Sequence, residues 1–404
     1  MNPTYKQFAD RLVSYCAVDT GSDPEKVGTF PSTENQWNLA NKLVDELKAF
    51  GIEPTLTKDC VVYGVLRGNP EKEAMCFVAH MDTAHDAQNW DVKPMIHTYS
   101  GSGAIELPLN GTVIPESDIL KTSVAPEGDL IVTSSGDTLL GADDKAGITV
   151  AMEILKTVTE QKLDVPDIWV VFTPDEEIGQ GAANFPYDKV EAKRAITIDG
   201  TKWGDIDIEC FTAFGFKLNI TGITAHPSVG KSAGMQSALW AGRKFLASLP
   251  EHEIPEETEG REPFIYVTDC EMSCASASIN GIVRSFDMEG IENLRGKIEA
   301  ALELTKVMYP KCQYDYKFYE QYRNMREYVP ESFTKQLVKA HQSAGIEPKL
   351  ISLRAGTDGS QISLQGLPCP NISTGAHNIH SIREFCSAAT MLKIHEICMA
   401  LLAQ

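Results

Sequence analysis

Histidine and acidic side chains follow apolar segments at several places in this chain of 404 residues, and such side chains can hold a metal ion. The first place is His80-Met81-Asp82, which follows the apolar run 74–79. Residues two apart in an extended chain point to the same side. Asp82 can therefore hold one imidazole nitrogen of His80 while the other nitrogen binds a metal. Taken alone, this short motif could equally form a surface hydrogen bond.

Two adjacent carboxylates, Asp143 and Asp144, lie between Gly141 and Gly147 at the start of an expected helix. The positive end of a helix dipole favours anions, and acidic residues often cap helices for that reason. Glycines on both sides also allow a tight turn and a close approach of the helix, which a simple cap does not need. A carboxylate at this point could bridge two cations.

Three consecutive acids, Asp175, Glu176 and Glu177, follow the apolar run 167–172. Carboxylates this close repel one another unless a positive charge lies between them. A solvated acidic loop is one interpretation. In the functional interpretation the two glutamates have different roles. One binds a metal, and the other stays free as a general base beside a metal-bound water.

Apolar runs of this length are typical of strands buried on both faces of a sheet, and a third run, 195–198, ends at Asp199. Helical patterns alternate with these runs. The alternation predicts an α/β catalytic domain with a mostly parallel central sheet flanked by helices. Because ligands of such sheets bind beyond the carboxyl ends of the strands, we expect the three acidic or histidine clusters at one edge.

The middle of the chain has a different pattern, in which strands alternate apolar and polar residues. The order strand, helix, strand, strand, helix predicts a compact α+β domain of roughly a hundred residues. We therefore expect a split catalytic domain, residues 1–210 and 326–404, with an inserted lid or dimerisation domain at residues 211–325. The strands and helices expected in this insert span residues 211–223, 232–249, 264–267, 276–286 and 288–308.

Charge and cysteine content restrict the partners and the compartment. The chain has 56 acidic and 36 basic residues, a net charge of −20, so we expect no nucleic acid and no anionic membrane as partner. No apolar stretch approaches the ~20 residues that span a bilayer, and the first residues lack a signal-peptide pattern. The 10 cysteines form no C-x-x-C pair, which indicates reduced thiols and a cytoplasmic protein.

Further histidines are candidates for the site. His226 lies in the expected insert, where an ordinary loop histidine is the alternative, and His377 and His380 compete as a last metal ligand. A ligand set of nitrogen and oxygen without thiolate suits catalytic zinc, cobalt or manganese. Two ions ~3.5–4 Å apart can polarise a carbonyl and activate a bridging water, so the predicted reaction is amide hydrolysis.

These motifs together resemble the peptidase T family of aminotripeptidases, in the superfamily of dinuclear zinc peptidases and deacylases that also holds acetylornithine deacetylase. The resemblance extends over nearly the whole chain and implies two zinc ions per subunit, a short peptide substrate and a homodimer. Its motifs are His80-Met81-Asp82-Thr83, residues 139–148, residues 172–179, Asp199-Gly200 and Gly356-Thr357-Asp358-Gly359.

The resemblance implies a ligand set for the two ions. His80 and Asp199 would bind the first ion, and Glu177 and His380 the second. Asp143 would bridge both ions, with a cis peptide bond to the next residue.

The resemblance also implies the other roles. His380 is chosen over His377, where the family has an aromatic residue, because the following Glu384-Phe385 fits the family spacing. Asp82 would orient His80, Glu176 would be the general base, and His226 from the lid would stabilise the tetrahedral oxyanion. The residues that resemble the family's substrate-holding positions, suited to a terminal carboxylate, are Arg284, Asn324 and Arg354.

One segment departs from the family pattern. Residues 84–127 match poorly, and in the family this region helps to recognise the amino end of the substrate. The leading hypothesis is therefore a two-zinc aminopeptidase acting on short peptides, with tripeptides as the expected length. The alternatives are an N-acyl amino acid deacylase or a dipeptidase of the same superfamily, and, in another class, a non-catalytic protein that binds metal or peptide.

Overall fold

The computed structural model describes residues 2–122, 125–200 and 202–404 and divides into two compact units. The first unit contains Met1–Ile208, Glu327–Ile351 and Thr357–Gln404, and the second contains Glu209–Arg326 and Ser352–Gly356. The two long boundaries lie within two residues of the expected ones. The short segment differs: residues 352–356 were expected in the catalytic domain and belong to the second unit.

Contacts of Arg354 explain why this short segment goes with the second unit. Its guanidinium donates hydrogen bonds to the carbonyl oxygens of Gly260 and Glu262, at 3.1 and 3.0 Å. It also lies 5.2 and 5.3 Å from the ring centroids of Phe211 and Phe264. These partners are distant in sequence, so a pattern along the chain does not reveal them.

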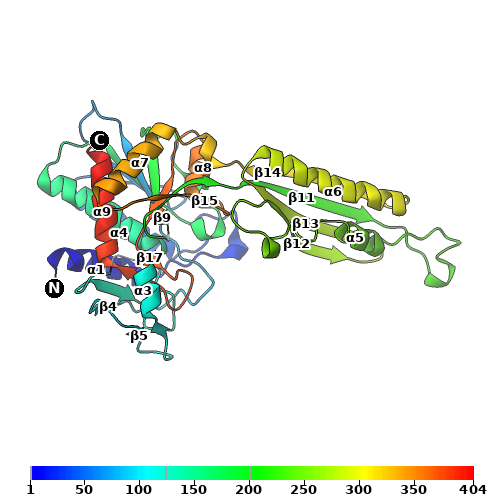
Figure 1. The fold of residues 1–404 in the computed structure, drawn as a ribbon, viewed down its shortest axis with the longest axis horizontal. Helices are drawn as coiled ribbons and strands as arrows, with labels where there is room; N and C mark the ends of the chain where they lie inside the picture. Colours follow the sequence, from blue (N-terminus) through cyan, green and yellow to red (C-terminus); the bar gives the residue numbers. More distant parts are fainter. Residues whose placement is uncertain (1, 123–124, 201) are drawn as a thin grey trace. The chain divides into compact units, whose positions relative to one another are not determined.

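A mixed eight-stranded sheet forms the centre of the first unit (Figure 1). Its four inner strands, β8, β3, β9 and β16, run parallel, and the pairs β1–β2, β2–β8 and β10–β16 are antiparallel. The strands in sheet order are β1 (Thr55–Leu56), β2 (Val62–Leu66), β8 (Ile168–Thr173), β3 (Met75–His80), β9 (Arg194–Gly200), β16 (Asn371–Ser373), β10 (Asp205–Cys210) and β15 (Lys349–Leu353).

Burial explains the apolar runs of this sheet. Strands β3 and β8 are buried at all of their positions, as strands covered on both faces should be. Helices flank the sheet, and α4 packs against β3 and β9. The predicted α/β class with a mostly parallel central sheet is therefore confirmed. The helices of this unit are α1 (Pro3–Cys16), α2 (Gln36–Ala49), α3 (Glu116–Thr122), α4 (Ala142–Gln161), α7 (Glu331–Ser343), α8 (Asp358–Leu364) and α9 (Ala388–Leu402).

Shorter elements complete the first unit. A four-stranded antiparallel sheet has the order β17-β18-β7-β4, and β5 pairs with β6. The strands are β4 (Met95–Thr98), β5 (Ile105–Glu106), β6 (Val113–Ile114), β7 (Leu130–Thr133), β17 (Ala376–His377) and β18 (Phe385–Ser387). The short 3-10 helices are η1 (Pro24–Lys26), η2 (Glu176–Ile178) and η3 (Gly181–Asn184).

The second unit is a four-stranded antiparallel sheet with two helices packed on it and on each other. Its core includes Phe216, Phe245, Ile279 and Leu294. The sheet order is β12 (Phe264–Met272), β13 (Ser276–Ser285), β11 (Thr212–Thr221) and β14 (Gln313–Tyr322). The two α-helices are α5 (Ala238–Leu246) and α6 (Met288–Met308). The short 3-10 helices are η4 (Pro227–Val229), η5 (Pro255–Glu257) and η6 (Met325–Glu327).

Strand β14 was not expected from the sequence. Its partly buried Tyr314, Tyr316 and Phe318 alternate with exposed polar residues such as Asp315 and Lys317, and no continuous apolar run marks it. An edge strand with one covered face gives only this weak alternation. The order of elements in the insert therefore has one more strand than predicted.

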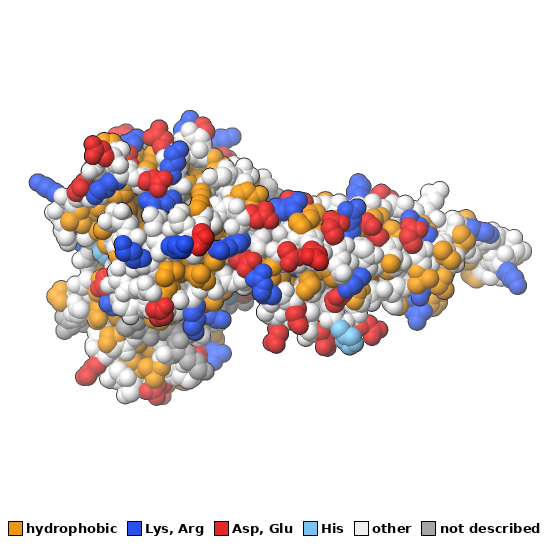
Figure 2. Space-filling view, turned by 45° about the horizontal axis from the view of Figure 1, so that its top comes forward, with side chains coloured by type: hydrophobic (Ala, Val, Ile, Leu, Met, Phe, Trp, Pro, Cys, Tyr) orange, Lys and Arg blue, Asp and Glu red, His pale blue; other side chains and the backbone are white. Residues whose placement is uncertain are grey.

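Acidic and basic side chains are interspersed over the face of the molecule seen in Figure 2. On α6, Arg295 Nε lies 2.8 Å from Glu299, and Lys306 Nζ lies 2.7 Å from Glu303. Pairs at this spacing add modest support to a helix. Among the helices of the described residues, none has the length and apolar character that a membrane span requires.

Helix α4 approaches β9 closely at Gly147. A Cβ atom at this position would lie 2.2 Å from the carbonyl oxygen of Ile198 and 2.5 Å from the carboxylate of Asp144. Such distances are far below van der Waals contact, and one of the atoms belongs to rigid backbone. The close helix approach expected from the glycines of this segment is therefore confirmed.

We expect Gly147→Ala to lower the free energy of unfolding by roughly 1–3 kcal/mol, because it overpacks this contact. Gly296 of α6 is the matched control, since a Cβ there would meet nothing within 4 Å. Gly296→Ala should raise the free energy of unfolding by about 0.5–1 kcal/mol through helix propensity. Urea unfolding measures both changes, and equal effects of the two substitutions would contradict the close approach.

Candidate metal centre

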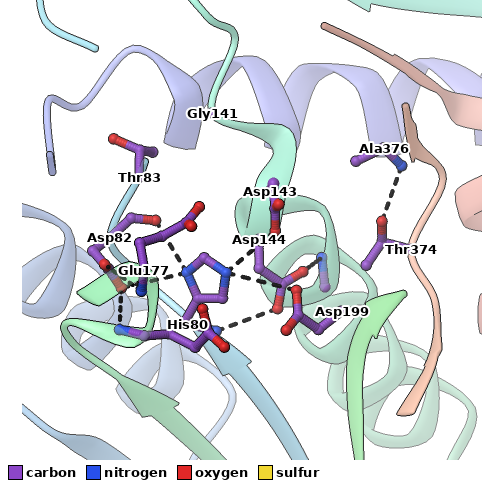
Figure 3. Close-up of polar contacts among 12 residues, drawn as sticks. His80, Asp82, Thr83, Gly141, Asp143, Asp144, Glu177, Asp199, Thr374 and Ala376 are labelled. Atoms are coloured by element: carbon purple, nitrogen blue, oxygen red, sulfur yellow. Dashed lines mark hydrogen bonds and ion pairs between the residues drawn. The ribbon is translucent and has the colours of Figure 1, made fainter. Parts of the chain in front are cut away.

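The carboxyl ends of three neighbouring strands bring His80, Glu177 and Asp199 together (Figure 3). His80 is the last residue of β3, the turn with Glu176 and Glu177 follows β8, and Asp199 lies near the end of β9. Strand β3 pairs in parallel with both other strands. The clusters expected at one edge of the sheet therefore lie at that edge.

Asp143 lies between two histidines. His80 Nε2 is 3.2 Å from Asp143 Oδ1 and 3.6 Å from Asp199 Oδ1. His380 Nε2 is 3.5 Å from Asp143 Oδ2 and 3.1 Å from Glu177 Oε2. Each oxygen of Asp143 thus faces one histidine, and each of these histidines also faces one further carboxylate, an arrangement that suits a carboxylate between two cations.

The donor atoms of this cluster fit divalent cations. Possible ligand atoms of His80, Asp143 and Glu177 all lie within 4.8 Å of one another, and so do those of His80, Asp144 and Asp199. Glu177 Oε1 is buried and, within the described part of the chain, accepts no hydrogen bond. Imidazole nitrogen and carboxylate oxygen are ligands of catalytic zinc and of manganese.

The pKa values of the cluster reflect burial and crowding of like charges. Burial, together with the nearby charge of Asp199, raises the pKa of Glu176 well above its usual value. Burial raises the pKa of Asp199 itself to about 8. Hydrogen bonds with Asp143 and Glu177 raise the pKa of His380 to about 11. Raised pKa values favour the protonated forms of these side chains, and a cation bound here would compete with such protons.

A tight turn presents Asp143. Gly141 adopts a left-handed conformation with φ of 76°, and the Asp143–Asp144 peptide bond is cis, as the resemblance implied. Glu384 is buried and its carboxylate accepts the N–H groups of Leu140, Gly141 and Asp143, at 2.7, 2.8 and 3.1 Å. The spacing of Glu384 matched the family pattern, but this contact was not predicted from the sequence.

Asp82 contacts both the His80 imidazole and the backbone of the acidic turn. Its Oδ1 lies 3.4 Å from His80 Nδ1, and its carbonyl oxygen lies 3.1 Å from the same nitrogen. Its two carboxylate oxygens also accept the N–H groups of Glu176 and Glu177, at 2.9 and 3.1 Å. One buried side chain therefore orients the imidazole and the backbone of the acidic turn. The sequence predicted only the first of these contacts.

Two further buried acids, one of them the first residue of the acidic turn, accept hydrogen bonds from other segments. Asp175 accepts hydrogen bonds from the N–H group of Ser32 at 2.8 Å and from Gln36 Nε2 at 2.7 Å. Asp358, from the last motif of the sequence, accepts one from Thr173 Oγ1 at 3.0 Å. Neither acid had a predicted role. Such contacts join distant segments, and the motifs show the residues but not their partners.

The two competing histidines lie in different surroundings. His377 belongs to β17, is buried, and packs against Phe385 with ring centroids 5.2 Å apart. His380 is the one that faces Asp143 and Glu177. The geometry thus favours the histidine that was chosen by family spacing.

The remaining predicted residues belong to the second unit, and His226 is the most exposed of them. It precedes η4, and its Nδ1 lies 2.7 Å from Ser228 Oγ. Arg284 donates hydrogen bonds to the carbonyl oxygens of Phe214 and Val283. The predicted roles of His226, Arg284 and Arg354 toward a substrate stay predictions.

Both atoms of the Asn324 side-chain amide form hydrogen bonds within the second unit. Its Oδ1 accepts the N–H groups of Cys210 and Arg326, at 3.2 and 2.9 Å. Its Nδ2 donates to Glu209 Oε1 and to the carbonyl oxygen of Phe286, at 3.1 and 2.8 Å. An amide offers two donors and two acceptor positions, and all four are engaged here. The predicted role of Asn324 toward a substrate stays a prediction.

Comparisons with known proteins agree in fold and family. Residues 138–404 match the model of the peptidase family M20/M25/M40. The chain is 37% identical over 399 residues to a protein of Shouchella clausii named peptidase T, with 97% of each chain covered. The solved structure of aminopeptidase PepT from Bacillus cereus matches with a TM-score of 0.77, at 20% identity and with 98% of each chain covered. A dinuclear metal-binding peptidase of family M20 from Bacillus subtilis matches with a TM-score of 0.67, at 12% identity and with 98% of each chain covered.

We expect His380→Ala to lose one of two bound metal ions, because this imidazole faces the Asp143 and Glu177 carboxylates. The matched control is His377→Phe, which keeps a ring against Phe385 and should keep both ions. Metal content after dialysis against a fixed free zinc concentration measures the difference. Loss of an ion from the His377 variant and not from the His380 variant would exchange the two assignments.

Proposed function

The chain belongs to the peptidase family M20/M25/M40, whose members are hydrolases acting on peptides, and we propose that it is a metal-dependent aminopeptidase for tripeptides. The observation that carries this proposal is the Asp143 carboxylate between His80 and His380. The relative named peptidase T supports the substrate class, because the similarity covers 97% of both chains.

We propose two zinc ions as the resident metals, with cobalt or manganese as possible substitutes. His80 and Asp199 would hold one ion, Glu177 and His380 the other, and Asp143 both. The resemblance to a dinuclear metal-binding peptidase supports the number of ions. When bound, such ions polarise a peptide carbonyl and lower the pKa of a nearby water.

Glu176 is the general base in this proposal. Its backbone N–H group donates a hydrogen bond to the Asp82 carboxylate, and burial raises the pKa of its side chain, which makes the carboxylate a better proton acceptor. It would take the proton of the attacking water and deliver it to the amine that leaves. Asp82 would act as a positioning residue for Glu176 and for His80.

The second unit would supply contacts to the substrate. His226 would donate a hydrogen bond to the tetrahedral oxyanion. Arg284 and Arg354 would bind the terminal carboxylate, for which a guanidinium is suited. Asn324 would support this unit from inside, because its amide is fully engaged.

A homodimer in the cytoplasm completes the proposal. The dimer follows from the family resemblance alone. The location is supported by the cysteines, none of which forms a disulfide in the part of the chain that the structure describes, and eight of which are buried. Free buried thiols are typical of proteins in a reducing compartment.

We expect the enzyme to release free alanine from Ala-Ala-Ala, to lose this activity on chelation and to regain it with added zinc. Ala-Ala and N-acetyl-Ala should react much more slowly. Preference for the dipeptide or for the acetylated substrate would make the protein a dipeptidase or a deacylase. No turnover of any of the three by metal-loaded protein would favour a metal-binding or peptide-binding protein.

We expect Glu176→Gln to lower kcat by roughly 10²–10⁴-fold, because the amide cannot accept the proton, while the bound metal is retained. Glu160→Gln, an exposed glutamate of α4, is the control and should leave kcat unchanged. Steady-state rates and metal analysis of the same samples measure the two effects. Full activity of the Glu176 variant would assign the base to another group.

A further inference from the structure

His380 directs its two ring nitrogens to two different groups of carboxylates. Nε2 faces Glu177 and Asp143, at 3.1 and 3.5 Å. Nδ1 lies 3.0 Å from Oδ2 of Asp86. A histidine that binds a metal through one nitrogen generally donates its other N–H group to a carboxylate or carbonyl, which fixes the ring and raises its basicity. Asp86 occupies this position for His380.

His80 has the same kind of partner on its far side. Its Nε2 faces Asp143, and its Nδ1 faces Asp82, two residues along the chain. For His380 the carboxylate comes from a loop that is distant in sequence. Each of the two histidines that face Asp143 therefore has a separate carboxylate near its Nδ1 atom.

The backbone that carries His380 is held in an unusual conformation. Asn378 and His380 both have positive φ, 51° and 59°, which is costly for residues other than glycine and persists only where neighbouring contacts impose it. One such contact joins Asn378 Nδ2 to Oδ2 of Asp118 at 3.0 Å, and another joins Ser381 Oγ to the carbonyl oxygen of Asn378 at 2.6 Å. Asp118 and Asp86 both belong to the segment that departs from the family pattern. This segment therefore contacts the His380 loop at two points.

We propose that Asp86 is a positioning residue that holds the His380 imidazole with Nδ1 protonated and Nε2 directed at the second metal ion. This inference rests on the proposed two-metal function. It gives the segment of residues 84–127, expected to recognise the substrate, a part in building the metal site.

Exposure of the pair makes the inference testable without unfolding the protein. The side chains of Asp86 and His380 are 56% and 37% exposed. Ion pairs this accessible to water contribute little to stability. Removal of the Asp86 carboxylate should thus leave the fold of the metal-free protein intact and act on the metal through His380.

The experiment is a cobalt titration of chelator-treated full-length protein, followed by the visible absorption of bound Co²⁺. His380→Ala identifies which binding step depends on His380. Asp86→Ala should weaken that step by roughly 10–100-fold, the usual effect of losing such a partner, and leave the other step unchanged. Asp86→Asn keeps an oxygen acceptor without the charge, so its affinity should lie between those of the wild type and Asp86→Ala.

Asp91→Asn is the matched control, because Asp91 is an exposed acid in the following part of the same segment whose carboxylate pairs with Lys93 at 3.0 Å. It makes the same change of charge and should titrate like the wild type. Melting temperatures of all metal-free variants are measured in parallel and should agree.

The outcomes separate this inference from the proposed function. Unchanged binding steps in Asp86→Ala would overturn the positioning role and leave the two-metal function standing. Equal weakening of both steps with a lower melting temperature of the metal-free protein would also overturn it, because Asp86 would then support the fold. A wild-type protein that binds fewer than two ions would instead reject the proposed function.

Discussion

Asp143 faces His80 with one carboxylate oxygen and His380 with the other, and the geometry of the whole centre depends on this one side chain. The chain can present it because Gly141 turns in a left-handed conformation and Glu384 accepts three N–H groups of the turn. Helix α4 then approaches β9 at Gly147, where a side chain would collide with backbone. Asp143 is therefore fixed by its own turn and helix, and the other side chains of the candidate metal centre are arranged around it.

Buried and partly buried carboxylates contribute to this site in two distinct ways. One group accepts hydrogen bonds from backbone or side-chain donors; its members are Asp82, Asp175, Asp358 and Glu384. These hydrogen bonds offset the free-energy cost of burying the charges and connect distant segments of the chain. Asp143, Glu177 and Asp199 crowd against one another and two histidines. Like charges in a buried space are stable only with protons or cations between them. The first group holds the second in place, and the second is where a metal fits.

Much of the fold followed from patterns along the chain. Strands β3, β8 and β9 were predictable because burial on both faces requires continuous apolar runs. Strand β14 was missed because its covered face shows only as tyrosines and a phenylalanine between polar residues. The attachment of Ser352–Gly356 to the second unit was missed because Arg354 finds its partners, Gly260 and Glu262, far away in sequence. Local patterns report burial, whereas such attachments depend on contacts between distant segments.

The same distinction between local patterns and contacts of distant segments applies to the metal centre. The sequence alone determined the residue types, the strand ends that carry them and the nearest pair, Asp82 behind His80, because residues two apart in an extended chain face the same side. Only the tertiary structure decided that Asp86 lies behind His380 and that Glu384 caps the Asp143 turn. Those contacts join segments that are distant along the chain, and their partners meet only once the sheet and its helices have packed.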